Sequence, residues 1–197
     1  ITAAELNQNL LIAGRAGSGK TNLTMLIMLS LIRLSVGWIA IDFKRDYRHL
    51  IRLEENVLIF DSDNFRINPL QPPKGTKPKT WLHHFTNIFC ESFFAETPVA
   101  AKSALLELLP LLYEKIRVER GDDCYPTLFD LADTIDQAIK RKGFKVSQPN
   151  RLVTIQSRLK PLLSISGSLF DCQKGYPLEE LLKRNVVLEF QGLASEF

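Results

Sequence analysis

The chain has 197 residues, of which 45% are hydrophobic and 24% charged, so it is long and apolar enough to form one α/β domain with a substantial core. Its formal net charge is +3 at pH 7, a small excess beside that of dedicated nucleic-acid-binding domains. Composition therefore excludes wholesale disorder, and charge alone selects no partner.

Cysteine use and apolar segments give an expectation about the compartment. Cys90, Cys124 and Cys172 lie far apart and form no CxxC pair, which argues against a disulfide scaffold or a zinc site. The most apolar segment, residues 23–36, is too short to span a bilayer. We therefore expect a cytoplasmic protein without a membrane segment. Because the chain begins at Ile1, almost directly on a predicted strand, we expect it to be a fragment.

The first third of the chain predicts a β-α-β unit. Residues 10–13 predict a buried strand, residues 20–36 a helix that is apolar on nearly all sides, and residues 38–41 a second strand. A short basic helix at residues 46–53 and a third strand at residues 57–60 continue the alternation. Such alternation is typical of an α/β fold with a parallel sheet.

Beyond a proline-rich break at residues 69–78 the pattern changes to helices. They are predicted at residues 81–94, from Thr97 to about Gly121, from Thr127 to Gly143, and at residues 150–164. The residues that cap, start or disturb them are Thr97, Pro98, Pro110, Thr127 with Asp130, Gly143 and Pro161. A short helix at residues 178–183 then leads into a last strand at residues 186–190.

This order predicts a parallel-sheet core that is interrupted by a helical block. Residues 1–80 form the first part of the core, residues 81–166 the helical insertion, and residues 167–197 the return to the sheet. We expect the element that follows the last strand to lie beyond Phe197.

A phosphate-binding loop is the strongest motif. The stretch GRAGSGKT, Gly14 to Thr21, matches G-x-x-x-x-G-K-[ST] between a predicted strand and a predicted helix. Glycines allow backbone conformations and close approach that a Cβ would block, so that successive N–H groups surround a phosphate. The residues expected to bind the nucleotide are Gly14, Arg15, Ala16, Gly17, Ser18, Gly19, Lys20, Thr21 and Asn22.

Two side chains of this loop carry the predicted chemistry. Lys20 is expected to neutralise the β- and γ-phosphate oxygens and is therefore also a catalytic candidate, and Thr21 is expected to give its hydroxyl to Mg²⁺. The predicted cofactors are ATP and Mg²⁺.

Hydrolysis also requires a carboxylate at a strand end. Three apolar runs end in an acid: Asp42, Asp61 and Glu189. Asp42 follows the strand after the P-loop helix and is the catalytic candidate; the alternative is that it pairs with Lys44 or Arg45. Asp61 lies in a turn, where an acid commonly caps the backbone. Glu189 is expected to face out of the core or to pair with a base.

Several stretches together resemble a known family. GRAGSGKTN at the P-loop, IAIDFKRDYRHL along the second strand and FRINPL after the third are similar to the HerA/FtsK superfamily of ring-forming DNA-pumping ATPases, particularly HerA helicases and conjugation-type ATPases. RLVTIQSRLKPLL and NVVLEFQGLAS resemble the segment before that family's Asp-Glu strand. The resemblance covers most of the chain, and only the P-loop is individually specific.

The resemblance implies a RecA-like P-loop NTPase core with a helical insertion, in a homo-oligomer that forms a hexameric ring around or against DNA and couples ATP hydrolysis to translocation. The family's Asp-Glu strand, polar sensor and arginine finger have no match before Phe197. On this interpretation the chain alone binds phosphate and lacks the catalytic acids. Asn68 matches the family's Asn-Pro motif, but Asn-Pro is also an ordinary turn starter, so its role is unassigned.

Two alternatives remain open. A small-molecule phosphotransferase would use Asp42 as the substrate base and Arg45 or Arg48 as phosphate clamps. A nucleotide-binding module would hold ATP without turnover.

Other basic residues have a functional and a simpler interpretation. Lysines 74, 77 and 79, and the run at residues 140–145, could contact DNA phosphates, whereas a solvated loop and a charged helix end are the simpler interpretation. The adjacent His83 and His84 point to different parts of a helix surface, and we predict no metal site there.

Overall fold

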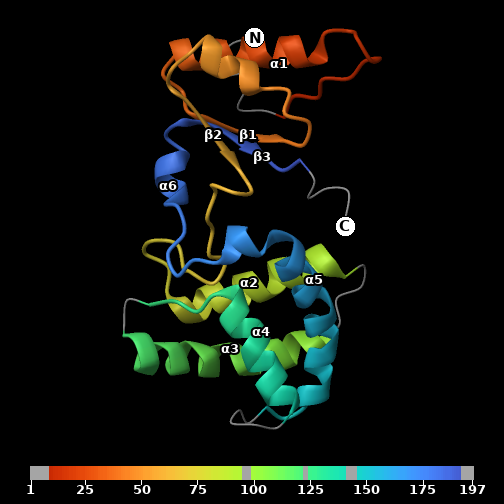
Figure 1. Cartoon of the computed structure of the whole chain (residues 1–197), viewed down its shortest axis with the longest axis vertical. Helices are drawn as coiled ribbons and strands as arrows, with labels where there is room; N and C mark the ends of the chain where they lie inside the picture. The colour runs from red at the N-terminus through yellow and green to blue at the C-terminus, as the bar shows by residue number, and fades with distance from the viewer. Residues whose placement is uncertain (1–8, 95–98, 122–123, 141–145, 192–197) are drawn as a thin grey trace. The chain divides into compact units, whose positions relative to one another are not determined.

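The computed structural model describes residues 9–94, 99–121, 124–140 and 146–191, and the chain divides into two compact units (Figure 1). The first unit comprises Ile1–Asn64 and Pro177–Phe197, and the second comprises Phe65–Tyr176. The second unit is larger at both ends than the helical block predicted at residues 81–166. Within the described residues, no helix is long and apolar enough to span a membrane.

The first unit contains the predicted parallel sheet, with three of the four expected strands. Its strands are β1 (Trp38–Asp42), β2 (Val57–Asp61) and β3 (Asn185–Glu189), in the order β1-β3-β2, so the last strand of the chain lies in the centre. The register aligns Asp42 with Glu189 and Glu189 with Asp61. The three acids therefore lie side by side at the carboxyl edge of the sheet.

Helix α1 (Lys20–Arg33) covers this sheet. It packs through an apolar cluster whose buried members are Met28, Ala40, Leu50, Val57 and Val187. The helix ends three residues before the predicted boundary at residue 36, because Ser35 adopts a left-handed φ of 56° and the Val36 N–H bonds back to the Leu31 carbonyl at 3.0 Å. The remaining short elements of the unit are η2 (Arg48–Arg52) and α6 (Leu178–Leu181).

The strand predicted at residues 10–13 is absent, and that prediction was wrong. Leu10 is 51% and Leu11 is 89% exposed, and among the described residues no backbone hydrogen bond joins this segment to the sheet. A parallel strand is held by ladder hydrogen bonds to a neighbour, so an apolar run that has no such neighbour stays irregular. The P-loop is therefore preceded by an irregular, largely exposed segment rather than by a buried strand.

The second unit is helical. It contains α2 (Pro78–Phe93), α3 (Val99–Arg120), α4 (Leu128–Ile139), η3 (Pro149–Arg151) and α5 (Leu152–Phe170). Apolar residues at helical spacing face one core, and its fully buried members include residues of α3, α4 and α5: Leu105, Leu108, Leu109, Leu112, Leu131, Ile135, Leu152, Ile155 and Leu159. This core accounts for the predicted change from strands to helices.

The predicted helix signals can be compared with these helices. Thr127 and Asp130 form a capping box at the start of α4, which confirms that prediction. Helix α3 continues through Pro110, and in α5 the non-helical residue is Ser166 rather than a neighbour of Pro161. The predictions for Thr97, Pro98 and Gly143 fall outside the described residues.

Candidate nucleotide-binding site

The glycines of the P-loop fall into two physical classes. Gly17 and Gly19 have left-handed φ values of 76° and 86°, while open space surrounds the position where a Cβ would stand. Gly14 lies where a Cβ would approach Ser18 Oγ to 2.5 Å. Backbone conformation therefore favours glycine at positions 17 and 19, and the close approach of the Ser18 side chain favours it at position 14.

The start of α1 is open to an anion. Gly19 occupies the N-cap position and has no side chain to accept from the first-turn N–H groups, and the first turn contains no acid. Loop residues 14–19 are exposed. The N–H groups and the positive end of the helix dipole therefore face a region that a phosphate can enter.

Lys20 lies back across the loop. Its Nζ donates to the Gly14 carbonyl at 2.9 Å and to the Arg15 carbonyl at 2.7 Å. Both bonds are exposed to solvent, so phosphate oxygens can replace the carbonyls as acceptors without unfolding the loop. Thr21 is partly buried in the first turn, and Asn22 is exposed beside it.

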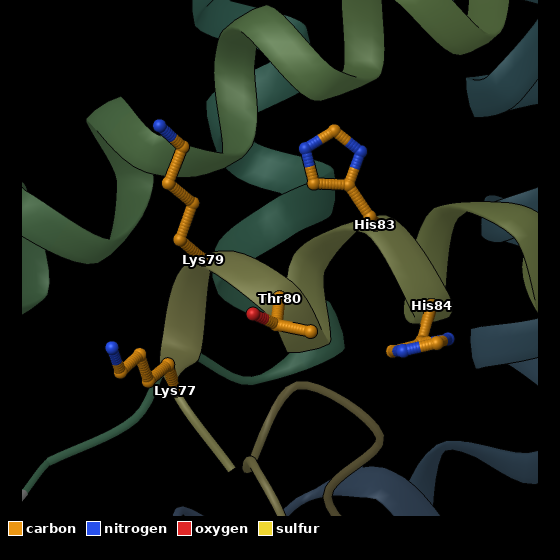
Figure 2. Close-up of a pocket in the computed structure, with 5 residues that line it drawn as sticks. All are labelled: Lys77, Lys79, Thr80, His83 and His84. Carbon is orange, nitrogen blue, oxygen red and sulfur yellow. The ribbon is translucent and has the colours of Figure 1, made fainter.

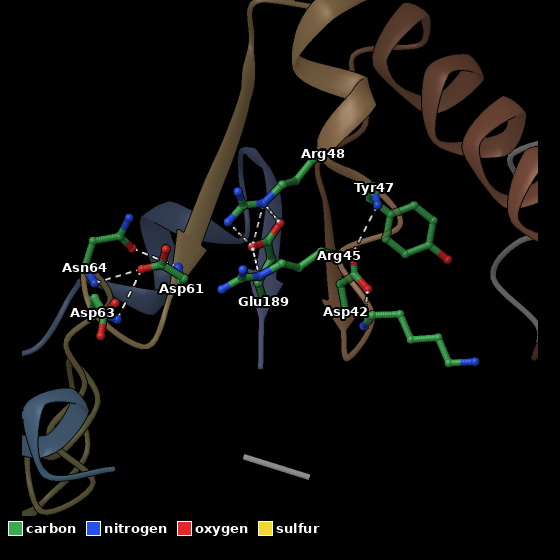
Figure 3. Close-up of polar contacts among 9 residues, drawn as sticks. Asp42, Arg45, Tyr47, Arg48, Asp61, Asp63, Asn64 and Glu189 are labelled. Atoms are coloured by element: carbon green, nitrogen blue, oxygen red, sulfur yellow. Dashed lines mark hydrogen bonds and ion pairs between the residues drawn. The ribbon is translucent and has the colours of Figure 1, made fainter. Parts of the chain in front are cut away.

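Asp42 holds the turn that follows β1. It is only 3% exposed, and its two carboxylate oxygens accept from the backbone N–H groups of Lys44 at 2.9 Å and Tyr47 at 3.0 Å (Figure 3). Its partners are therefore backbone amides, not the Lys44 or Arg45 side chains. The catalytic role of Asp42 stays a prediction.

Asp61 closes the turn after β2 in a similar way. One carboxylate oxygen accepts from the N–H groups of Asp63 and Asn64, both at 3.1 Å, and Asn64 Oδ1 accepts from the Asp61 N–H at 2.9 Å. This is the backbone-capping interpretation of the sequence.

Glu189 pairs with two bases, in agreement with the expectation that it pairs with one. Its side chain is fully buried, and it accepts from Arg48 Nε at 2.8 Å and Nη2 at 2.7 Å and lies 3.3 Å from Arg45 Nε (Figure 3). The hydrogen bond from Arg48 to Glu189 raises the pKa of the guanidinium above its ordinary value. The sequence did not reveal this pairing because Arg48 and Glu189 are 141 positions apart.

Asn68, which the sequence left unassigned, is a buried hydrogen-bonding centre of the second unit. It is 5% exposed, its Nδ2 donates to the carbonyls of Pro126 at 3.0 Å and Gln173 at 2.8 Å, and its Oδ1 accepts from the Leu70 N–H at 2.9 Å. Three segments of the second unit meet at this amide, which therefore has a structural role.

The second unit also has a basic pocket, which is lined by Lys77, Lys79, Thr80, His83 and His84 (Figure 2). The two histidines project in different directions from α2. Within the described part of the chain, no three His, Cys, Asp or Glu side chains are grouped to hold a metal ion. Of the second predicted basic run, residues 141–145 lie outside the described residues.

Comparisons with known proteins agree with the resemblance seen in the sequence. Residues 1–73 match the family model described as the central domain of helicase HerA. The fold is similar to that of VirB4 from Thermoanaerobacter pseudethanolicus, with a TM-score of 0.60 and 15% identity over 90% of this chain and 48% of that chain. This chain thus spans about half the length of the VirB4 structure. No curated protein matches the chain. At this identity the structural match shows the α/β, RecA-like fold alone.

Proposed function

We propose that this chain, whose residues 1–73 match the model of the HerA central domain, is the ATP-binding part of a DNA-translocating motor. The observation that carries this proposal is the exposed P-loop at the start of α1, beside a parallel sheet of the HerA/VirB4 type. The description of the matched family as a helicase supports DNA as the polymer on which the complete protein acts.

The geometry of the P-loop fits a triphosphate. The first-turn N–H groups of α1 surround the β-phosphate, and Lys20 exchanges the Gly14 and Arg15 carbonyls for phosphate oxygens. Because the ammonium already lies over the loop, little rearrangement is needed for this exchange. These features support a polyphosphate ligand rather than a neutral molecule, and we propose that it is ATP.

Magnesium fits the same site through Thr21. Mg²⁺ keeps several waters and is usually held by few protein groups together with substrate phosphates. A single hydroxyl in the first turn is consistent with that demand. The ion would supply charge neutralisation between the β- and γ-phosphates.

Oligomer formation and turnover belong to the complete protein. The HerA family supports a homo-oligomeric ring, and we propose that the nucleotide bound by this chain drives movement of such a ring along DNA. A DNA-stimulated ATPase activity of the full-length protein would support this role; full-length protein that binds Mg-ATP without hydrolysing it in the presence of DNA would contradict it.

The nucleotide site is tested by Lys20→Ala. Loss of the ammonium removes the charged partner of two phosphates, so we expect affinity for Mg-ATP to fall by about 100-fold or more in a calorimetric titration. Lys44→Ala removes an exposed lysine outside the loop and is expected to leave the affinity unchanged. Circular dichroism should show an unchanged fold in both variants. Equal ATP affinity of wild type and Lys20→Ala would reject the site.

A nucleotide-binding module without turnover is the second candidate. One observation bears on it: each oxygen of Asp42 accepts a hydrogen bond from the backbone of its own turn, which supports a structural role for this acid. The burial of Asp42, which is 3% exposed, counts against the phosphotransferase alternative, because a substrate base must reach the proton that it removes. Hydrolysis by the full-length protein would contradict this candidate. Loss of hydrolysis in Asp42→Asn with unchanged stability in chemical denaturation would indicate a catalytic Asp42, whereas loss of both would indicate a structural one.

A further inference from the structure

The cations of the chain are unevenly distributed. Residues 65–90 contain one arginine, three lysines and two of the three histidines of the chain, and no Asp or Glu. These four positive charges exceed the net charge of +3 for all 197 residues. The segment is therefore a local excess of positive charge in a nearly neutral protein.

Within this segment, four cationic or titratable side chains line one pocket. Lys77, Lys79, His83 and His84 surround it together with Thr80, and all five residues are exposed (Figure 2). The pocket is shallow, with a volume of about 500 Å³, and none of its lining residues is an acid. A shallow, wide pocket of this kind suits an extended polymer better than an enclosed small molecule.

The lysines of the pocket differ from other lysines of the protein in their partners. Lys160 lies 3.1 Å from Asp136, and Lys183 lies 3.4 Å from Glu180. Among the described residues, no ion pair of this kind involves Lys77 or Lys79. Repulsion between neighbouring unpaired cations opposes folding, so an anionic partner that neutralises them gains free energy on binding.

The helix that carries most of the pocket residues, α2, is held in place by contacts within the second unit. The Trp81 indole N–H donates to the Pro69 carbonyl at 2.9 Å, and its ring lies 6.4 Å from the His84 ring. On the same helix, Leu82 and Phe85 are buried in the core of the second unit. The lysines and histidines are therefore presented by a helix whose opposite face is fixed.

We propose that this basic pocket binds the phosphodiester backbone of DNA, at a place distinct from the nucleotide site. The lysines form ion pairs with phosphate oxygens, and the Thr80 hydroxyl adds a hydrogen bond to the same backbone. The choice of DNA among polyanions rests on the proposed function. Such contacts carry no sequence information, in keeping with a motor that moves along any sequence.

The test measures binding of a fluorescein-labelled DNA duplex to the 197-residue chain by anisotropy across a salt series. For Lys77→Gln/Lys79→Gln we expect a loss of affinity of about 10-fold at low salt, and a decrease of about 2 in the magnitude of the slope of log K against log[salt]. The matched control is Lys160→Gln/Lys183→Gln, which removes two acid-paired lysines and should leave both quantities near the wild-type values.

The outcomes separate this inference from the proposed nucleotide site. Both double variants should bind Mg-ATP as wild type does, and Lys20→Ala should bind DNA as wild type does. A wild-type chain that binds Mg-ATP but not DNA, or equal DNA loss in the two double variants, would overturn the inference and leave the nucleotide site standing. Preference for anionic lipid vesicles or heparin over DNA would also overturn it.

Discussion

Two basic stretches of the chain look alike in sequence and differ in structure. Residues 44–52 contain five Lys, Arg and His side chains with one acid, and residues 74–84 contain five with none. In the first stretch, Arg45 and Arg48 converge on the buried Glu189. In the second, Lys77 and Lys79 face solvent around a shallow pocket. The comparison teaches that a basic run becomes a binding surface only where the fold supplies no acid of its own.

The largest expected loss of stability comes from a substitution in the first stretch, residues 44–52. Arg48→Ala leaves Glu189, whose side chain is fully buried, with only the 3.3 Å contact from Arg45. We expect this variant to lower the free energy of unfolding more than any other variant below, because an incompletely paired carboxylate stays buried. Chemical denaturation measures this change. Lys79→Ala, the equivalent change in the second region, should alter stability by less than about 0.5 kcal/mol.

A second variant identifies the cause of that loss. Glu189→Gln in the Arg48→Ala background removes the buried charge, so it should recover about 1 kcal/mol or more of the lost stability. If the double variant is no more stable than Arg48→Ala, lost packing of the arginine rather than the orphaned carboxylate explains the effect.

An intermediate case is the ion pair between Arg120 and Asp130. The side chains are 36% and 16% exposed, and their closest distance is 2.7 Å. Burial alone would raise the pKa of Asp130, but the hydrogen bonds from Arg120 and Thr127 outweigh it and hold this pKa below its ordinary value. We expect Arg120→Gln to cost about 1 kcal/mol at pH 7.

The same pair predicts a pH dependence. A carboxyl whose pKa is lowered by folding stabilises the protein above its ordinary pKa, and this contribution is lost as the pH falls through the lowered value. The stability difference between wild type and Arg120→Gln should therefore be constant near neutral pH and shrink below about pH 4. A difference that stays constant down to pH 2 would show that Asp130 is not the group involved.

The smallest effect belongs to a surface pair. Lys183 lies 3.4 Å from Glu180, and the two side chains are 71% and 64% exposed. We expect Lys183→Gln to change stability by no more than about 0.3 kcal/mol, because solvent and side-chain entropy offset the attraction. A loss comparable to that of Arg120→Gln would contradict the ranking by burial.

Local sequence patterns predicted most of the elements, and long-range contacts decided the rest. The spacing of apolar residues gave α1, the three strands and the helices of the second unit, and Thr127 with Asp130 marked the start of α4. The prediction for residues 10–13 was wrong because a strand depends on a neighbour, which no local pattern contains. The position of Asn68 between Pro126 and Gln173 could not be predicted for the same reason.

The residues of the candidate site also differ in how far the local sequence predicts their conformation and partners. The conformation of the P-loop could be predicted because it depends on local sequence, and Gly17 and Gly19 adopt left-handed φ values that favour glycine. The partners of Asp42 and Glu189 could not be predicted, because both acids lie at the end of a strand. Only the folded chain shows that backbone amides bind Asp42 and that arginines bind Glu189.

The central place of β3 in the sheet has a consequence for biosynthesis. On the ribosome, β1 and β2 emerge more than 100 residues before Asn185, although both pair with β3 in the finished sheet. The helices of residues 78–170 emerge in between and have mostly local contacts, which close faster than distant ones. We therefore expect the nascent chain to fold its second unit first, because the sheet of the first unit cannot form before β3 emerges.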